Sequence, residues 1–261
     1  MRLSVLLQSA VAAGASSRLE IPPSWAQGRT TYGGLTAAIC AAEAERQFPG
    51  LPAMRSAQIA FVGPAGGEVE ARAEMLRQGK SSAFVEVTLH GAHGIVSRGV
   101  FVYGIARESA LRMTDMPMPD VPGPGEARPI SRSPARPRFL ENFEIRLAGG
   151  AAPFSGSDES RMLWWARHTD AAMRDSAIGL LAAGDVTPPA AASFLEEVVP
   201  VASVNWQMDV LTDRLDTDDG WLLLSTRAQS AADGWSAQDM RMWTELGQPV
   251  AAGRQTTVLF G

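Results

Sequence analysis

Residues suited to metal or redox chemistry are scarce in this sequence. It contains one cysteine, Cys40, and three histidines, His90, His93 and His168. A single cysteine cannot form an intramolecular disulfide, and this set cannot supply a Cys/His metal cluster. The glycine pair 66–67 lacks the spacing of a phosphate-binding loop and is typical of a hairpin turn. The sequence therefore predicts neither a metal site nor a nucleotide-binding loop.

A carboxylate, a hydroxyl and an amide in the second half of the chain are better candidates for functional side chains. Asp185 follows a helix-like stretch and precedes the turn sequence 187–189, so it is either a helix-end carboxylate or a functional acid or base. Ser203 opens a strand-like run, where its hydroxyl is solvated, strand-paired or part of a site. Gln255 lies in the apolar run 250–260, where a buried amide needs a hydrogen-bond partner unless it faces solvent on an edge strand.

The composition limits the class of protein. The chain has 261 residues, of which 46% are hydrophobic and 20% charged, with a net charge of −5. At about 150 residues per domain, this length predicts one large or two small domains. The sequence pI near 5.3 argues against a nucleic-acid-binding protein. Collagen-like, disordered and disulfide-scaffold classes are excluded by the same figures.

The N-terminal residues 1–17 superficially resemble a signal peptide. Leu3, Leu6 and Leu7 instead fall on one face of a short amphipathic helix, and the polar Ser4 interrupts the apolar run. We therefore favour a helix and expect a cytoplasmic protein. No run reaches the roughly 18 apolar residues of a membrane-spanning helix.

Each half of the chain is expected to contain one helix followed by several strands. In the first half, an Ala-rich helix extends to about Phe48 and ends before Pro49–Gly50. Alternating apolar and polar residues then predict antiparallel strands. These expected strands cover residues 69–75, 85–89 and 96–103.

The second half repeats this order. A helix is expected over 170–183, ended by Gly184 and the prolines that follow. The expected strands cover residues 202–211, 221–230, 237–245 and 250–260. Between the halves, residues 115–138 contain seven of the 17 prolines, which favours an extended linker. We therefore expect an N-terminal domain at 1–114 and a C-terminal domain at 139–261.

Local matches suggest that the two halves arose by duplication. Residues 78–83 correspond to 232–237 at an offset of 154, and Gly94 corresponds to Gly247 at an offset of 153. The simplest arrangement is an α+β fold in which each helix is wrapped by an antiparallel sheet. The two sheets are then joined side by side, which leaves fewer open edges.

Three sequence motifs in this order resemble acyl-CoA thioesterase II. They are Tyr-Gly-Gly at 32–34, AQIAFVGP at 57–64 and GQPVAAGRQ at 247–255. The resemblance covers nearly the whole chain. It implies a tandem, or double, hotdog fold and a thioesterase that hydrolyses an acyl-CoA substrate to the free acid and CoA.

The resemblance also implies a catalytic group in the second half. Asp185, Ser203 and Gln255 match the acid, hydroxyl and amide that hold the attacking water in this family, which usually has Thr in place of Ser203. Asn205 and Trp206 depart from the nearby Asp and His of the family. A carboxylate that accepts the proton of water contributes about 10²–10⁴-fold to the rate. No metal or organic cofactor is implied.

The first half is expected to lack this group. Its counterparts are roughly Pro49–Gly50, Ser56 and Phe101, so we expect one catalytic site per chain. The backbone amides of Gly33 and Gly34, at the start of the first helix, are candidates to bind the substrate oxyanion of the opposite site.

Two other functions are compatible with the same fold. One is a double hotdog that binds an acyl-CoA or acyl ligand without catalysis, which the departures at Asn205 and Trp206 favour. The other is a hotdog hydratase, which would need an Asp–His pair that neither helix supplies. An internal hotdog pair makes a monomer feasible, and the composition leaves open whether the chain forms a homo-oligomer.

Overall fold

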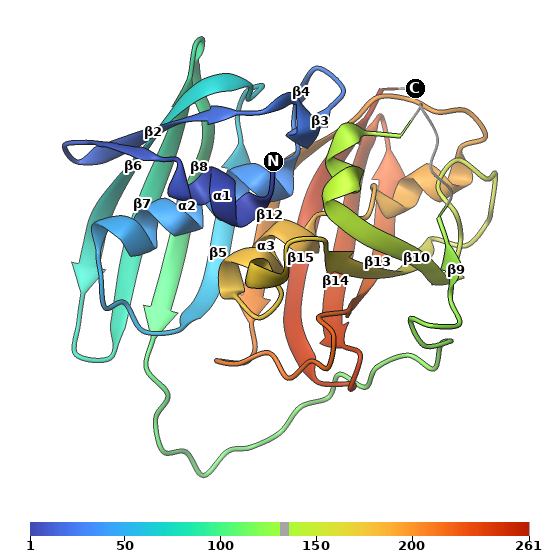
Figure 1. Ribbon diagram of the computed structural model, residues 1–261. Coiled ribbons are helices and arrows are strands. Elements are labelled where there is room, and N and C mark those ends of the chain that lie inside the picture. Colours follow the sequence, from blue (N-terminus) through green and yellow to red (C-terminus); the bar gives the residue numbers. More distant parts are fainter. Residues whose placement is uncertain (131–135, 261) are drawn as a thin grey trace.

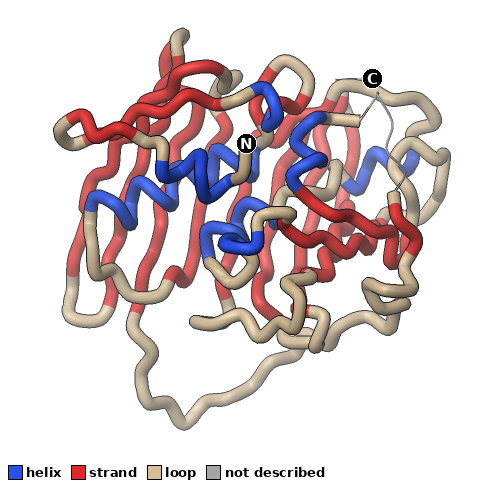
Figure 2. The backbone as a smooth tube through the Cα atoms, viewed as in Figure 1, coloured by secondary structure: helices blue, strands red, loops and turns tan. Residues whose placement is uncertain are grey.

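A computed structural model describes residues 1–130 and 136–260. Its dominant feature is one 13-stranded antiparallel sheet, with the main helices packed on one face (Figures 1 and 2). The order of strands is β1-β2-β6-β7-β8-β5-β12-β15-β14-β13-β11-β10-β9. The short strands β3 (Ala26–Gln27) and β4 (Thr30–Thr31) form a separate pair. Among the described residues, no helix is long and apolar enough to cross a membrane.

The elements of the two halves follow the same plan. The first half contains α1 (Leu3–Gln8), β1 (Val11–Ala13), β2 (Ser16–Ile21), η1 (Pro23–Trp25), α2 (Gly33–Gln47), β5 (Met54–Phe61), β6 (Gly67–Gln78), β7 (Ser82–Gly91) and β8 (Gly94–Gly104). The second half contains β9 (Arg128–Pro129), η2 (Arg138–Asn142), β10 (Phe143–Gly150), β11 (Arg161–His168), η3 (Ala171–Met173), α3 (Ala177–Gly184), η4 (Ala190–Phe194), β12 (Val201–Val210), β13 (Leu222–Ala232), β14 (Trp235–Thr244) and β15 (Pro249–Leu259).

The halves join through β5 and β12. These strands pair in antiparallel register, from Asn205 opposite Ala60 to Asp209 opposite Ser56. Beyond β5 the order is β8, β7, β6, β2, and beyond β12 it is β15, β14, β13, β11. The same order on both sides of the junction agrees with the duplication inferred from the sequence, and the side-by-side joining of the sheets was expected.

Helix α2 is surrounded by the first-half sheet because its buried face consists mainly of small residues. Ala37, Ala41 and Ala44 have no exposed surface. Helix α3 packs beside α2, and both lie on the same face of the continuous sheet (Figure 1). Ser176 begins α3 by accepting a hydrogen bond from the backbone amide of Gly179 at 2.9 Å.

Two expected helices are shorter than the sequence pattern indicated. The N-terminal helix ends at Gln8, and residues 11–21 form a hairpin whose turn uses Gly14 at φ 69°. The stretch expected as one helix over 170–183 is a 3-10 turn followed by α3. The reason is that Asp170 caps the first segment and Ser176 separately caps the second.

The proline-rich segment 115–138 forms no α-helix in its described part, as its prolines predict. Residues 131–135 of this segment lie outside the described residues. Two tryptophans of the second half donate hydrogen bonds to its backbone. Trp165 Nε1 donates to the carbonyl of Pro122 at 2.9 Å, and Trp243 Nε1 donates to that of Met116 at 2.8 Å. These bonds attach the segment to the second-half sheet.

Candidate active site

The structure brings Asp185, Ser203 and Gln255 into direct contact. Gln255 Nε2 donates to Asp185 Oδ1 at 2.7 Å and approaches Ser203 Oγ at 2.9 Å. Ser203 Oγ donates to Asp185 Oδ1 at 3.4 Å. The three residues come from the end of α3, the start of β12 and the middle of β15. Side chains 70 positions apart in sequence therefore form one polar cluster.

The burial of this cluster changes the acidity of Asp185. The Asp185 side chain lies at the C-terminal end of α3, and the residue is only 8% exposed. Burial raises the pKa of Asp185 to about 6, although hydrogen bonds from Gln255, the Gly34 amide and Ser203 oppose this effect. A carboxylate with a pKa near the working pH is suited to accept a proton from water.

The N-terminus of α2 closes the cluster from the other half of the chain. The backbone amide of Gly34 donates to the Asp185 carboxylate, where the helix dipole favours negative charge. A Cβ atom on Gly33 would stand 2.6 Å from Asp185 Oδ2, and one on Gly34 would stand 2.6 Å from the Ala182 carbonyl oxygen. Glycine is therefore required at both positions for this close approach of α2 to α3.

Tyr32, directly before these glycines, is a site residue whose role the sequence did not reveal. Its buried hydroxyl donates to the Ala182 carbonyl at 2.6 Å. Burial, reinforced by the charge of Asp185, holds the pKa of Tyr32 well above its usual range. Tyr32 therefore stays neutral and ties the start of α2 to the last turn of α3.

Gln238 is a second residue that sequence reasoning missed. It lies on β14 directly opposite Gln255, and its Nε2 donates to Gln255 Oε1 at 2.6 Å. No signal in the sequence predicted this pair, because a register shift between Met242 and Trp243 decides which residue of β14 lies opposite Gln255.

The two departures from the family pattern have different positions. Val204 is an extra residue in β12, since Ser203 pairs with Thr257 and Asn205 with the adjacent Thr256. This bulge leaves the residue at 205 exposed and turns Trp206 into the core. Trp206 packs against Gly184, where a Cβ atom would meet its ring at 2.8 Å. Asn205 thus lies away from the cluster, and Trp206 supports the end of α3.

The register identifies the matching positions in the first half. Strand β5 has its own bulge at Arg55, because Met54 pairs with Tyr103 and Ser56 with Val102. The counterpart of Ser203 is therefore Met54, the residue before the bulge, and not Ser56 as the sequence suggested. Phe101 is the counterpart of Gln255, as expected from the sequence.

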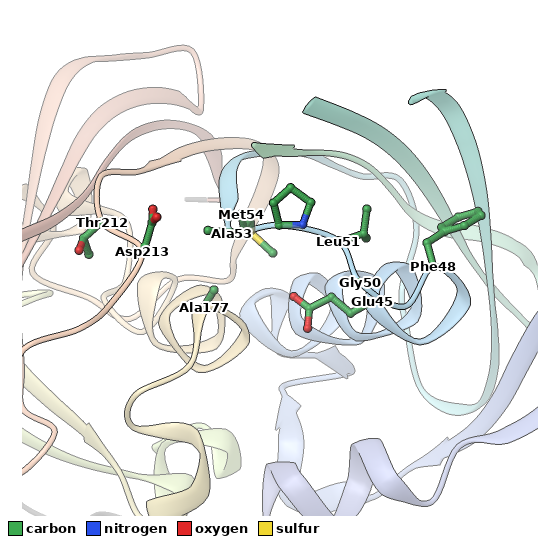
Figure 3. A pocket seen from close by; sticks show the side chains of 10 residues that line it. Glu45, Phe48, Gly50, Leu51, Ala53, Met54, Ala177, Thr212 and Asp213 are labelled. Carbon is green, nitrogen blue, oxygen red and sulfur yellow. The ribbon is translucent and has the colours of Figure 1, made fainter. Parts of the chain in front are cut away.

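A cavity occupies the corresponding place at the other end of the helix pair. It has a volume of about 420 Å³ and is lined by residues such as Glu45, Gly50, Met54 and Ala177 (Figure 3). Its walls include the C-terminal end of α2 and the first residue of α3. Asp185, Ser203 and Gln255 do not line it, so this cavity is separate from the catalytic candidates.

The fold and the family models define a class, the hotdog-fold thioester hydrolases. Models of the acyl-CoA thioesterase N-terminal and C-terminal domains match residues 21–105 and 114–259. The chain therefore belongs to the acyl-CoA thioesterase family and is a thioester hydrolase. The resemblance to acyl-CoA thioesterase II is confirmed.

Solved structures similar to the whole chain share its fold. A hotdog-fold protein of unknown function from Alicyclobacillus acidocaldarius is 21% identical over 100% of this chain and 99% of its own, with a TM-score of 0.89. A putative thioesterase from Novosphingobium aromaticivorans is 25% identical over 97% and 99%, with a TM-score of 0.80. An acyl-CoA thioesterase II from Mycobacterium marinum is 18% identical over 99% and 98%, with a TM-score of 0.74. Among curated proteins, no sequence matches.

Proposed function

We propose that this tandem hotdog protein hydrolyses acyl-CoA by direct attack of water, with Asp185 as the general base. The observation that carries the proposal is the contact of Asp185 with both Gln255 and Ser203, at 2.7 and 3.4 Å. A non-catalytic binding protein whose site had degenerated would not need to keep a buried carboxylate, a hydroxyl and an amide together. The geometry therefore favours hydrolysis over acyl-ligand binding alone.

Each polar side chain of the cluster has a role in the reaction. Ser203 and Gln255 orient a water molecule, and Asp185 accepts a proton as the water oxygen forms a bond to the thioester carbon. The carbonyl oxygen becomes an oxyanion in the tetrahedral intermediate. When this intermediate collapses, the carbon–sulfur bond breaks, and the proton held by Asp185 passes to the departing CoA sulfur. The products are the free acid and CoA.

The N-terminus of α2 is where we place the developing oxyanion. The amides of Gly33 and Gly34 lie at the positive end of a 15-residue helix. The Gly34 amide donates to Asp185, so the Gly33 amide is the donor that we assign to the oxyanion. Preorganised amide donors at such a position stabilise negative charge that develops in the transition state. Each half thus contributes to the site, α2 from the first and the general base from the second.

One site per chain is the arrangement that we propose. In the first half, the residue that ends α2, as Asp185 ends α3, is Phe48 and not Pro49–Gly50 as the sequence suggested. Met54 and Phe101 occupy the places of Ser203 and Gln255. None of these three side chains can accept a proton from water, so the first half has no counterpart of the Asp185–Ser203–Gln255 cluster. The carboxylates that line the cavity in Figure 3, Glu45 and Asp213, come from other positions.

The test is the release of free thiol from short-, medium- and long-chain acyl-CoAs. We expect the wild-type protein to hydrolyse members of this series and Asp185→Asn to lose about 10²–10⁴-fold in kcat. Asp209→Asn is the matched control, because Asp209 lies on β12 but is exposed. Activity that survives Asp185→Asn would remove Asp185 from the mechanism. Folded wild-type protein that hydrolyses no acyl-CoA would favour the ligand-binding function.

A further inference from the structure

Gln238 occupies a position where the other half of the molecule has an apolar side chain. Across the second-half sheet, Gln255 pairs with Gln238, and across the first-half sheet Phe101 pairs with Val85. Val85 and Gln238 are both 0% exposed. A buried amide costs free energy unless its oxygen and nitrogen are both hydrogen-bonded. The fold accepts valine at this place, so packing alone does not explain the glutamine.

The hydrogen bonds of Gln238 have a fixed direction. Its Oε1 accepts from the backbone amide of Ala190 at 2.8 Å, and its Nε2 donates to Gln255 Oε1 at 2.6 Å. A backbone N–H can only donate, so it requires the oxygen of Gln238 on its side. The nitrogen of Gln238 must then face Gln255 and select the oxygen of that amide. The nitrogen of Gln255 is consequently directed at Asp185 and Ser203.

We propose that Gln238 is a positioning residue for thioester hydrolysis, which holds the amide of Gln255 with its nitrogen toward Asp185. This inference rests on the proposed function of the cluster. The amide of Ala190 is the fixed reference, because it belongs to the backbone at the start of η4. The orientation of a catalytic side chain is thus set by a backbone group that does not touch it.

Loss of Gln238 removes the hydrogen-bond donor that holds the Gln255 amide in this orientation. The two ends of the Gln255 amide are nearly equal in shape, and rotation by about 180° about its last side-chain bond exchanges them. In the rotated state Gln255 Oε1 would face Asp185 Oδ1, and two acceptors would repel each other. The neighbours of Asp185 that affect its ionisation are Tyr32, Ser203, Gln255 and the Gly34 amide, of which only Tyr32 is titratable. Loss of the Gln255 bond therefore raises the pKa of Asp185 further.

The variant that tests the proposal is Gln238→Met, which keeps the length of the side chain without its hydrogen bonds. We expect kcat for acyl-CoA hydrolysis to fall about tenfold to a hundredfold, the effect of losing one hydrogen bond to a charged group. The acid limb of the pH–rate profile should also move to higher pH. In a Gln255→Met background, Gln238→Met should cause no further loss of kcat, because its effect passes through Gln255.

Thr226→Val is a matched control for a purely structural effect. The Thr226 hydroxyl shares a buried hydrogen bond of 2.7 Å with Thr187 and lies on β13, next to β14. This variant should lower thermal stability without moving the acid limb. A change in the Gln238→Met profile that Thr226→Val reproduces would show a structural role and overturn the proposal.

A readout that needs no activity separates this proposal from the function itself. Carbon NMR of the Asp185 carboxyl group gives its pKa directly in the wild type and in Gln238→Met. A higher pKa in the folded variant supports the positioning role. An unchanged pKa overturns it, as would additive losses of kcat in the double variant. If the wild type releases no thiol, the proposed function fails, and the NMR titration still decides the role of Gln238.

Discussion

Gly33 of the first half and Asp185 of the second half are in such close contact that no side chain fits between them. A Cβ atom on Gly33 would stand 2.6 Å from Asp185 Oδ2 and 3.1 Å from the ring of Phe61. The contact joins residues 152 positions apart in the sequence. It places the positive end of one helix against the carboxylate that ends the other.

Substitution of Gly33 by alanine should therefore damage the site more than the fold. The new methyl group must displace Asp185, and misplacement by about 1 Å costs up to a hundredfold in rate. Alanine in a helix is preferred over glycine by about 1 kcal/mol, and this gain offsets the cost of displacing Asp185. Thermal stability should therefore change little. Gly66→Ala is the control, because its Cβ would meet no atom within 4 Å. Full thiol-release activity of Gly33→Ala would contradict this expectation.

The pH dependence of the reaction should report the raised pKa of Asp185. The general base must be ionised, so kcat/KM, which reports the free enzyme, should fall about tenfold per pH unit below a midpoint of about 6 and be constant above it. An ordinary aspartate would place the midpoint near 3.8. Thioesters of N-acetylcysteamine are the substrates for this measurement, because they lack the phosphates of CoA. A midpoint near 4 would show that the pKa of the general base is not raised and would contradict this prediction.

The same shift predicts that Asp185 destabilises the folded protein at neutral pH. The folded-state pKa of about 6 lies above the unfolded value of 3.8, so the folded state binds the proton more tightly. Stability therefore falls as pH rises from 3.8 through 6, by about 3 kcal/mol in total. Asp185→Asn should be more stable than the wild type at pH 8, and this advantage should disappear near pH 3.5. Urea unfolding at the two pH values measures both effects.

Asp170→Asn is a control variant for which the expected change in stability at pH 8 has the opposite sign. Burial opposes the shift, but hydrogen bonds from Ser4 and Ala172 hold the pKa of Asp170 below its usual value. Asp170 therefore stabilises the folded state above pH 3.8, and its substitution should lower stability at pH 8. An Asp185→Asn protein that is also less stable at pH 8 would contradict the predicted sign.

Tyr32→Phe should weaken the contact between the two halves. The variant keeps the stack on Phe139, with ring centroids 3.9 Å apart, and loses the hydroxyl that donates to the Ala182 carbonyl. A buried acceptor that loses its donor costs about 1–3 kcal/mol, which urea unfolding can measure. Tyr103→Phe is the matched control, since the buried Tyr103 hydroxyl has no partner among the described residues. If both variants lose the same free energy of unfolding, the Tyr32 hydrogen bond contributes nothing to stability.

The sequence by itself indicated the duplication and, in each half, a helix followed by strands. The longer strands that precede these helices, β2, β10 and β11, were not expected. Apolar and polar residues alternate with a period of two wherever one face of a strand is buried, so β6, β7 and β12–β15 were visible as patterns. Gln255 was also visible, because an amide in an apolar closing strand needs a partner. The resemblance then supplied Asp185 and Ser203, which local pattern alone does not distinguish from a turn carboxylate and a strand hydroxyl.

Only the tertiary structure decided which side chains meet. The bulge at Val204 sets the face of β12 that Ser203 and Trp206 share, and the matching bulge at Arg55 moves the counterpart of Ser203 to Met54. A single extra residue inverts the alternation, and its energy depends on the neighbouring strands rather than on local sequence. The contacts of Tyr32 and Gln238 likewise depend on segments distant in the chain. Cross-strand register and helix-to-helix distance therefore fix the site, because both result from packing of the whole chain.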